Sequence, residues 1–143
     1  MKYSDYLKTV TECPLCSGPK RVNEVILQSD KSFLTYALSP YHKHHLLVVP
    51  NRHVESLSEL DESEMEDIDA LQEKALEILK KLSYTNISLL VREGNVENKS
   101  VSHTHFHIIP NIRIGDLDHY GKERRVLTET EVTQTLSDIQ AVL

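Results

Sequence analysis

Three histidines in the last third of the chain are spaced so that they could do chemistry together. His103, His105 and His107 stand at alternate positions, with Phe106 and Ile108 among the residues between and after them. A β-strand sends successive side chains to opposite faces, so this spacing predicts a strand with the imidazoles on its open face and the apolar side chains toward a core. The imidazoles would then stand about 7 Å apart, too far to bond one another but suited to one extended substrate.

Such a row of imidazoles can supply several kinds of chemistry. Near neutral pH histidine acts as a nucleophile, a general acid or base, or a metal ligand. The simplest alternative is a solvated edge strand that happens to be rich in histidine. Phe106, Ile108 and Ile109 would anchor the opposite side of the strand in a core, and this favours a functional cluster.

The same stretch carries a family resemblance. Residues 100–109 (Ser-Val-Ser-His-Thr-His-Phe-His-Ile-Ile) resemble the signature of the histidine triad (HIT) family of nucleotidyl hydrolases and transferases. In that signature three histidines alternate with apolar residues, and a serine stands three positions before the first. Further matches are residues 45–50 (His-Leu-Leu-Val-Val-Pro) followed by His53, and Glu-Gly at residues 93–94. The resemblance covers about residues 13 to 110.

The resemblance implies a covalent mechanism and a set of site residues. His105 would be the nucleophile that attacks the α-phosphorus of a nucleotide, and water would open the resulting nucleotidyl-histidine. Its other ring nitrogen needs an acceptor, commonly a backbone carbonyl. His107 would donate to a phosphate oxygen, and Ser100 would hydrogen-bond the leaving-group atom. The residues expected to contact substrate are Leu38, Arg92, Ser100 and His107.

Two positions depart from the family pattern. Many members place Asp or Asn where this chain has Ala37, three residues before Pro40, to bind the ribose hydroxyls. Arg92 stands where the family usually has an Asn or Gln that contacts phosphate. Arg92 could hold phosphate bidentately, or pair with Glu93 or another acid and point away. Together the two changes leave the reaction type intact and open the choice of substrate.

The chain's only two cysteines, Cys13 and Cys16, form a C-x-x-C motif. In a reducing compartment this spacing indicates metal ligation or redox chemistry, the alternative being two free thiols in a turn. A closed tetrahedral zinc site needs two more ligands, and neutral imidazole is the usual complement. The chain resembles the zinc-bearing HIT branches, including galactose-1-phosphate uridylyltransferase. That resemblance implies His53 and His103 as the other ligands of one structural Zn²⁺ per chain, with no position open to water.

The remaining histidines and two tyrosines are given lesser roles. His45 is expected to be structural. Three further histidines have no constraining partner in the sequence and are expected to be solvated: His42, His44 and His119. Tyr41 and Tyr120 could line a base pocket, although a core or surface position is the simpler interpretation.

Composition limits the classes of protein that remain. The 143 residues are enough for a single domain, 1–143, with a real core. Acidic residues outnumber basic ones by 22 to 16, giving a net charge of −6, which argues against non-specific nucleic-acid binding. Much of the acid lies in residues 55–77, which we expect to be a solvated helix face. No apolar run has transmembrane length and no signal-peptide core is present, so a cytoplasmic protein without a membrane partner is the default expectation.

Hydrophobic periodicity predicts an α+β fold. The strands expected are residues 22–28, 32–38, 44–49, 87–92 and the histidine stretch. A short helix is expected over 4–10, and capping boxes at Asp61 and Thr128 predict a long helix ending near Leu82 and a closing helix. About five strands joined by short turns favour an antiparallel sheet. The HIT fold is of this kind, with a motif-bearing core over about 13–110 and a C-terminal extension over 111–143. The resemblance also implies a homodimer.

Three functions are compatible with these residues. The leading hypothesis is a HIT-type hydrolase or transferase acting on a nucleoside phosphoramidate, a dinucleoside polyphosphate or a related phosphoanhydride. The second is a catalytically weak, zinc-stabilised module that binds nucleotides or a partner, which Ala37 favours. The third and weakest is a catalytic metal centre built from the histidine row, which alternate positions on one strand form poorly. Retention of all three histidines and Ser100 favours the enzyme, because binding alone requires no nucleophile.

Overall fold

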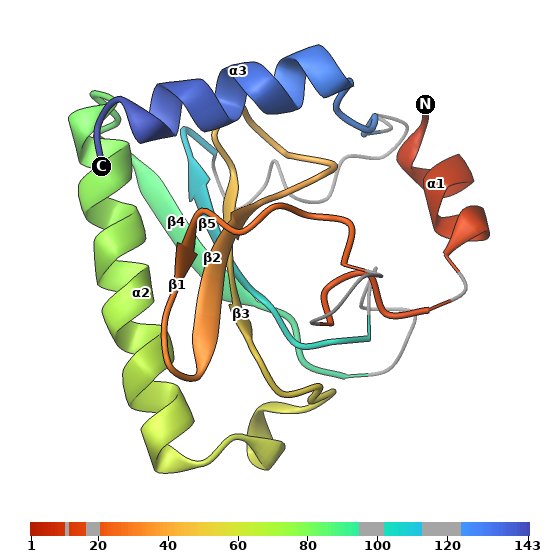
Figure 1. The fold of residues 1–143 in the computed structure, drawn as a ribbon, viewed down its shortest axis with the longest axis vertical. Helices are drawn as coiled ribbons and strands as arrows, with labels where there is room; N and C mark the ends of the chain where they lie inside the picture. Colours follow the sequence, from red (N-terminus) through yellow and green to blue (C-terminus); the bar gives the residue numbers. More distant parts are fainter. Residues whose placement is uncertain (11, 17–20, 95–101, 113–123) are drawn as a thin grey trace.

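The protein has a five-stranded antiparallel sheet with helices packed around it (Figure 1). The computed structural model describes residues 1–10, 12–16, 21–94, 102–112 and 124–143. Its elements are α1 (Tyr3–Thr9), β1 (Leu27–Gln28), β2 (Ser32–Tyr36), β3 (Leu46–Pro50), a 3-10 turn (Leu57–Glu59), α2 (Glu62–Lys81), β4 (Ile87–Val91), β5 (Phe106–Pro110) and α3 (Glu129–Gln140). The strand order is β1-β2-β3-β5-β4, and the α+β antiparallel fold expected from the sequence is confirmed.

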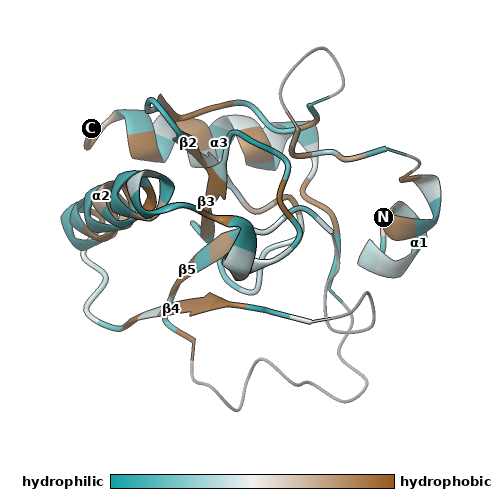
Figure 2. Cartoon of the chain, turned by 90° about the horizontal axis from the view of Figure 1, so that it is seen from below, coloured by the Kyte–Doolittle hydropathy of each residue, from teal (hydrophilic) through white to brown (hydrophobic). Residues whose placement is uncertain are grey.

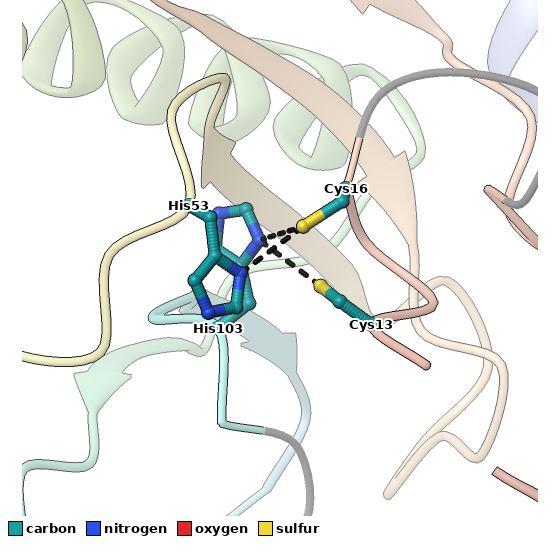
Figure 3. Close-up of side chains that lie close together, drawn as sticks. All are labelled: Cys13, Cys16, His53 and His103. Carbon is teal, nitrogen blue, oxygen red and sulfur yellow. Dashed lines mark hydrogen bonds between the residues drawn. The ribbon is translucent and has the colours of Figure 1, made fainter. Parts of the chain in front are cut away.

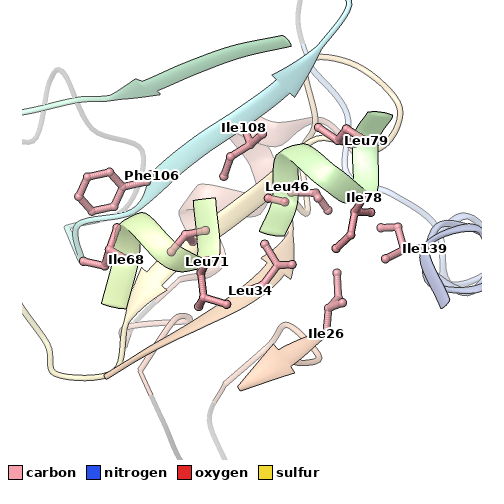
Figure 4. Close-up of a cluster of buried hydrophobic side chains, with 12 residues drawn as sticks. Ile26, Leu34, Leu46, Ile68, Leu71, Ile78, Leu79, Phe106, Ile108 and Ile139 are labelled. Atoms are coloured by element: carbon pink, nitrogen blue, oxygen red, sulfur yellow. The ribbon is translucent and has the colours of Figure 1, made fainter. Parts of the chain in front are cut away.

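Helix α2 lies along one face of the sheet, and α3 closes one end of the same core (Figures 1 and 4). Every second residue of the central strands points toward α2, as the period of a strand requires. The buried cluster on this face consists of Ile26, Leu34, Leu46, Val48, Phe106 and Ile108 from the sheet side, Ile68, Leu71, Ala75, Ile78 and Leu79 from α2, and Ile139 from α3. Figure 2 shows β3 and β4 as mainly hydrophobic, while α2 is mainly hydrophilic outside this stripe. The amphipathic spacing predicted for α2 is therefore confirmed.

The opposite face of the sheet carries a second, smaller apolar cluster. It consists of Leu15, Phe33, Ala37, Leu47 and Val49. All five residues of β3 are buried, which confirms that this strand is covered on both faces. In the register of the sheet, Leu47 of β3 pairs with His107 of β5, and so His107 shares this second face with the smaller cluster. The sheet thus separates a helix-covered core from the face that carries His107.

The capping box predicted at the start of α2 is present, and it has a buried member. The Asp61 side chain accepts from the Glu64 amide at 2.8 Å, and the Glu64 side chain accepts from the Asp61 amide at 3.1 Å. Glu64 is only 4% exposed, so the expectation of a uniformly solvated acidic face is wrong at this position. Arg52 is the reason, because its guanidinium donates to both Glu64 oxygens at 2.7 and 3.3 Å and holds the pKa of that carboxyl below its usual range.

The strand predicted over residues 22–28 is much shorter in the structure. Only Leu27 and Gln28 form β1. In the residues before β1, hydrogen bonds that involve side chains replace the backbone pairing of a strand. Asn23 donates its amide to the Tyr36 carbonyl at 2.6 Å, and Thr35 donates its hydroxyl to the Glu24 carbonyl at 2.7 Å. Such side-chain bonds compete with the ladder of a sheet and end the strand early.

Asp67 of α2 ties the β1–β2 turn to the helix. Its carboxylate accepts from the Ser29 hydroxyl at 2.7 Å, from the Ser32 hydroxyl, and from the Lys31 amide at 3.2 Å. Hydrogen bonds to a charged acceptor are stronger than neutral ones. This one side chain therefore sets how the hairpin sits against α2.

Replacing Asp67 with alanine should lower the free energy of unfolding by about 2 kcal/mol, because three donors of the turn lose a charged acceptor. Urea denaturation measures the effect. Asp69→Ala, on the exposed side of the same helix, is the matched control and should change stability by less than about 0.5 kcal/mol. Equal losses in the two variants would show that the turn does not depend on this carboxylate.

Candidate functional site

Two cysteines and two histidines from three separate segments converge on one point (Figure 3). Cys13 and Cys16 lie in the turn before β1, His53 follows β3, and His103 precedes β5. One donor atom from each lies within 4.8 Å of all the others. The Cys16 sulfur is 3.0 Å from Nδ1 of His53, and both sulfurs are 3.4–3.5 Å from Nδ1 of His103. Two thiols and two imidazoles at this spacing could hold a metal ion.

The orientation of His103 suits it to be a ligand. Its Nε2 lies 2.9 Å from the Pro50 carbonyl. A carbonyl can only accept, so Nε2 carries the proton and the lone pair of neutral His103 is on Nδ1, facing the cysteines. Burial lowers the pKa of His103 to about 4, which keeps the ring neutral. A backbone carbonyl fixing the tautomer of a histidine in this way is the usual support of a metal ligand.

The cysteines are the other half of the cluster. Burial, with the neighbouring Cys13 next in effect, raises the pKa of Cys16 to about 11. A bound metal cation would favour the thiolate form and deprotonate coordinating thiols outright. Among the described residues, no carboxylate belongs to the cluster. Sulfur and nitrogen donors without oxygen fit a soft or borderline cation rather than Mg²⁺ or Ca²⁺.

The prediction that one strand runs through all three histidines is wrong about where the strand begins. β5 begins only at Phe106, and His103 lies outside it with a fully buried side chain. The physical reason is the pair of contacts made by His103, to Pro50 and to the cysteines, which draw this residue out of line with the strand. Phe106 and Ile108 do face the core away from His107, so the alternation holds from residue 106 onward.

His105 and His107 lie closer together than strand spacing predicted. Their ring centroids are 4.7 Å apart, and His107 is buried rather than on an open face. Nδ1 of His105 is 2.8 Å from the carbonyl of His103. Since the carbonyl accepts, Nδ1 of His105 carries the proton, and the neutral ring has its lone pair on Nε2. His105 therefore has the tautomer that a nitrogen nucleophile needs.

A chain of hydrogen bonds fixes the tautomer of His107 as well. The Tyr41 amide donates to Nδ1 of His45 at 3.2 Å. Neutral His45 must then carry its proton on Nε2, which lies 2.9 Å from Nδ1 of His107. Nδ1 of His107 accepts this hydrogen bond, so neutral His107 carries its proton on Nε2. His45, expected from the sequence to be only structural, thus turns His107 into a hydrogen-bond donor.

Burial keeps this chain of imidazoles neutral. Desolvation lowers the pKa of His45 to about 3, and the charges of Arg124 and His105 act in the same direction. Desolvation also lowers the pKa of His107 well below its usual range, with further effects from His105, His45, Arg92 and Arg124. At neutral pH each ring therefore has one donor and one acceptor nitrogen, as the tautomers above require.

The two histidines line a small pocket of about 50 Å³. Its lining includes apolar side chains such as Leu15 and Leu47 and polar groups of Asn23, Ser39 and Arg124. Tyr3 and Tyr6 of α1 also line the pocket, although α1 has no buried residue. The volume exceeds what one water molecule needs but is far below the roughly 300 Å³ of common ligand sites.

The other predicted site residues are placed as follows. Leu38 lines the pocket, and Ala37 contributes a methyl group beside it. Arg92 donates to the Tyr41 hydroxyl at 3.4 Å and makes no ion pair with the described residues. Its charge is close enough to His107 to lower the pKa of that ring. Ser100 lies outside the described residues, as do His119 and Tyr120.

The expectation that His44 is solvated is wrong. His44 is buried, with Nδ1 2.7 Å from the Tyr84 hydroxyl and Nε2 2.8 Å from Asp138 of α3. Its φ of 67° places it in the left-handed region, which is uncommon for a residue other than glycine. The two hydrogen bonds hold it there, immediately before β3. No sequence pattern links residues 44, 84 and 138, so this contact could not be found from the sequence. His42 is half-buried, with its ring edge-on to Tyr84.

Sequence patterns did not point to Arg124 either. Its guanidinium lies 4.3 Å from the ring centres of both Tyr3 and Tyr41 and donates to the Ser39 carbonyl at 3.1 Å. This contact joins the N-terminal helix to the loop after β2. A lone arginine in an unassigned stretch carries no signal in the sequence, and only the fold brings it to the histidines.

Enclosure of the pocket comes from outside the sheet. Residues 1–3 and 124–127 bond to each other and to the loop after β2, which brings Tyr3, Arg124 and Tyr41 into one stack. In Figure 1, α1 lies on the side of the molecule away from α2, and it buries no side chain of its own. Backbone hydrogen bonds and the Arg124 guanidinium hold this cover, whereas the sheet that bears the histidines is fixed by its core.

Comparison with known proteins agrees with this geometry. The family model of the HIT domain matches residues 20–113. The chain belongs to the HIT family. Among curated relatives, an uncharacterised HIT-like protein of Methanocaldococcus jannaschii is 29% identical over 116 residues, 80% of this chain and 88% of that protein. The HIT chain is thus matched over nearly the whole length of a relative.

Two characterised relatives match over part of the HIT chain. The adenosine 5′-monophosphoramidase of Schizosaccharomyces pombe is 34% identical over 73 residues, 51% of this chain and 53% of that enzyme. The AP-4-A phosphorylase of Mycobacterium tuberculosis is 30% identical over 102 residues, 68% of this chain and 52% of that enzyme. The chain therefore spans about half the length of each of these two enzymes.

Solved HIT structures share the fold. A hypothetical histidine triad nucleotide-binding protein of Sulfolobus tokodaii superposes with a TM-score of 0.69 at 20% identity, over 84% of this chain and 83% of that one. A zinc-bound histidine triad protein of Mycobacterium smegmatis gives a TM-score of 0.61 at 18% identity, over 82% of this chain and 86% of that one. No helix in the described part of the HIT chain is long and apolar enough to cross a membrane.

The buried neutral histidines predict a loss of stability in mild acid. In the unfolded chain His45 and His107 titrate near pH 6.5, but in the folded chain their pKa values are lower. Below about pH 6.5 the unfolded chain binds more protons, so the free energy of unfolding should fall by up to about 1.4 kcal/mol per pH unit for each histidine. Urea denaturation between about pH 7.5 and 5 measures this slope.

His45→Asn supplies the comparison for that measurement. This variant removes one of the buried histidines that take up a proton on unfolding, so its slope should be smaller than that of the wild type by up to about one proton. Identical slopes in the two proteins would contradict the assignment of His45 as a buried neutral ring.

Proposed function

We propose that this protein is a nucleotidyl hydrolase or transferase that cleaves a nucleoside phosphoramidate, a dinucleoside polyphosphate or a related phosphoanhydride through His105. The observation that carries the proposal is the pairing of tautomers in the pocket. His105 presents a lone pair on Nε2, and His107 presents a proton on Nε2. A nucleophile beside a hydrogen-bond donor is the arrangement that attack on a phosphoryl group requires. Membership of the HIT family and the two enzyme relatives support the same chemistry.

The first step forms a bond between His105 and the α-phosphorus. As Nε2 of His105 attacks, the bond from phosphorus to the leaving nitrogen or oxygen breaks, and its electron pair goes to the leaving group. A leaving nitrogen takes up a proton from solvent and departs as a neutral amine, whereas a leaving phosphate departs as the anion. The His105 ring becomes an imidazolium, and the His103 carbonyl accepts from its Nδ1–H throughout. Nε2–H of His107 donates to a non-bridging phosphate oxygen as charge develops there.

The second step returns the enzyme to its starting state. Water attacks the phosphorus on the side opposite the P–N bond to His105, that bond breaks, and its electron pair returns to Nε2. The attacking water releases its proton to solvent, which balances the proton taken up by a leaving nitrogen in the first step. The products are a nucleoside monophosphate and the amine or phosphate that left first. Ser100, which lies outside the described residues, is proposed to hydrogen-bond the leaving atom, and Leu38 and Arg92 are proposed to contact the nucleoside and its phosphate.

We further propose that Cys13, Cys16, His53 and His103 hold one structural Zn²⁺. The donor set supports this, because four sulfur and nitrogen atoms complete a tetrahedral shell and leave no position for water. Bound zinc would supply a fixed link between the turn before β1 and the segment before β5. The catalytic step itself is assigned to the chain's own histidines.

A second candidate function has one observation in its favour. The pocket of about 50 Å³ beneath Tyr3 and Tyr6 is small for a nucleotide, so the protein could be a binding module that turns over little. The tautomers of His105 and His107 favour the enzyme, since binding would not need a nucleophilic nitrogen.

Replacing His105 with asparagine should abolish turnover, by at least about 1,000-fold, because the nucleophile is lost while the pocket is kept. The substrates are adenosine and guanosine phosphoramidates and a diadenosine polyphosphate, and released nucleoside monophosphate is measured. His42→Asn, outside the pocket of His105, should retain wild-type rates. Unchanged turnover in His105→Asn would refute covalent catalysis, and nucleotide binding without turnover by the wild type would favour the binding module.

Zinc content provides an independent test of the metal proposal. Metal analysis of the purified protein should give about one Zn²⁺ per chain, and Cys13→Ser with Cys16→Ser should abolish it. A metal that binds only the folded chain stabilises it by about 2.7 kcal/mol at a hundredfold excess over its Kd, so the double variant should unfold at a lower temperature. Full zinc content in that variant, or none in the wild type, would rule out this site.

A further inference from the structure

Arg124 is a fixed cation at the edge of the catalytic pocket. The rings of Tyr3 and Tyr41 lie against it, each with its centre 4.3 Å from the guanidinium carbon. Such cation–π contacts restrict the plane of the guanidinium and leave its edge to hydrogen-bond. A guanidinium has five N–H donors, and within the described part of the chain one is engaged, by the Ser39 carbonyl at 3.1 Å.

The backbone around Arg124 is also held in place. Its carbonyl accepts from the Tyr3 amide at 2.8 Å, and two residues later the Val126 amide donates to the Met1 carbonyl at 2.7 Å. The Leu127 amide donates to the Leu38 carbonyl at 3.0 Å. These bonds tie residues 124–127 to both walls of the pocket, so the position of the cation is set by the fold rather than by a loose side chain.

Ser39 adds a buried hydroxyl that lacks a partner. The residue is 5% exposed and lines the pocket together with Arg124, and its Oγ has no hydrogen-bond partner among the described residues. A buried hydroxyl without a partner is costly, and most are satisfied in native proteins. Its presence beside a cation indicates that a ligand atom completes the hydrogen bonding here.

The kind of ligand follows from what the pocket lacks. None of the described residues that line it carries a carboxylate, and Ala37 offers only a methyl group. The two hydroxyls of an unsubstituted ribose donate hydrogen bonds and are best read by an anionic acceptor. Arg124 can only donate, and a guanidinium matches the paired oxygens of a phosphate. Arg124 is therefore suited to an anion, and the described lining offers no carboxylate that would read the hydroxyls of a free ribose.

We infer that Arg124 and Ser39 form a subsite for a second phosphate, carried on the 2′ or 3′ oxygen of the nucleotide whose α-phosphate His105 attacks. The inference rests on the proposed function and adds a substrate class to it. Arg124 would bind the sugar phosphate through the edge of its guanidinium, and the Ser39 hydroxyl would donate to one of its oxygens. The reaction at the α-phosphorus is unchanged, so the subsite governs selection and not chemistry.

Kinetics on paired substrates test this subsite. The substrates are adenosine 5′-phosphoramidate and the same compound with a 2′- or a 3′-phosphate. Wild-type protein should prefer a phosphorylated sugar by at least about tenfold in kcat/KM, and the better of the two identifies the oxygen. Arg124→Ala should reduce this preference, the ratio of kcat/KM for the phosphorylated over the plain substrate, by about 10- to 100-fold, the usual range for a charge-assisted contact.

Two further variants separate selection from folding. Arg125→Ala, the neighbouring arginine that pairs with Glu131, should keep the wild-type preference. Ala37→Asp places a carboxylate next to the proposed subsite, which should repel a sugar phosphate, accept from ribose hydroxyls and reverse the preference. A purely structural role of Arg124 would lower kcat/KM for both substrates equally, and that outcome would overturn the inference.

Equilibrium binding keeps the test independent of turnover. Calorimetry with AMP, adenosine 2′,5′-bisphosphate and adenosine 3′,5′-bisphosphate should show tighter binding of one bisphosphate to the wild type and loss of the difference in Arg124→Ala. If no phosphoramidate is turned over yet this difference is found, the proposed catalysis fails and the subsite stands. If AMP and both bisphosphates bind equally, the subsite is refuted even where turnover is observed.

Discussion

The site depends on the position of one residue, His103. Its side chain turns inward to the two cysteines and to the Pro50 carbonyl, while its own carbonyl accepts a hydrogen bond from Nδ1–H of His105. One residue therefore connects the Cys–His cluster to the ring that we assign as nucleophile. Any shift of the turn before β1 would reach His105 through two hydrogen bonds, because protein interiors transmit displacement between close-packed groups.

Desolvation is the second constraint on the site. His45 and His107 are placed in a region where charge is costly, and their low pKa values follow mainly from burial. A neutral imidazole has one donor and one acceptor nitrogen. The hydrogen bond from the Tyr41 amide therefore fixes the tautomer of His45, and His45 in turn fixes that of His107. The chemistry at His107 is thus set by a backbone N–H in the loop before β3, acting through the ring of His45.

The amino-acid sequence by itself determined the antiparallel α+β fold, the boundaries of α2 and the order of its motifs. Periodicity and capping are local properties, so the pattern of residues alone was enough to place Ile68, Leu71 and Ile78 in the core and Asp61 at a helix start. Cys13, Cys16, His53 and His103 were grouped by their resemblance to a family pattern, and the fold does bring them together.

Only the tertiary structure decided the rest. Several features of the site join residues that are far apart in the chain. They are the bend at His103, the hydrogen bond from His45 to His107, the burial of His44 between Tyr84 and Asp138, and the position of Arg124 at the pocket. Strand spacing predicted a straight row of exposed imidazoles, because spacing alone contains no contact with another segment. Which nitrogen of each ring bears the proton depends on such contacts, and so the chemistry of the histidines was settled by the fold rather than by their order in the sequence.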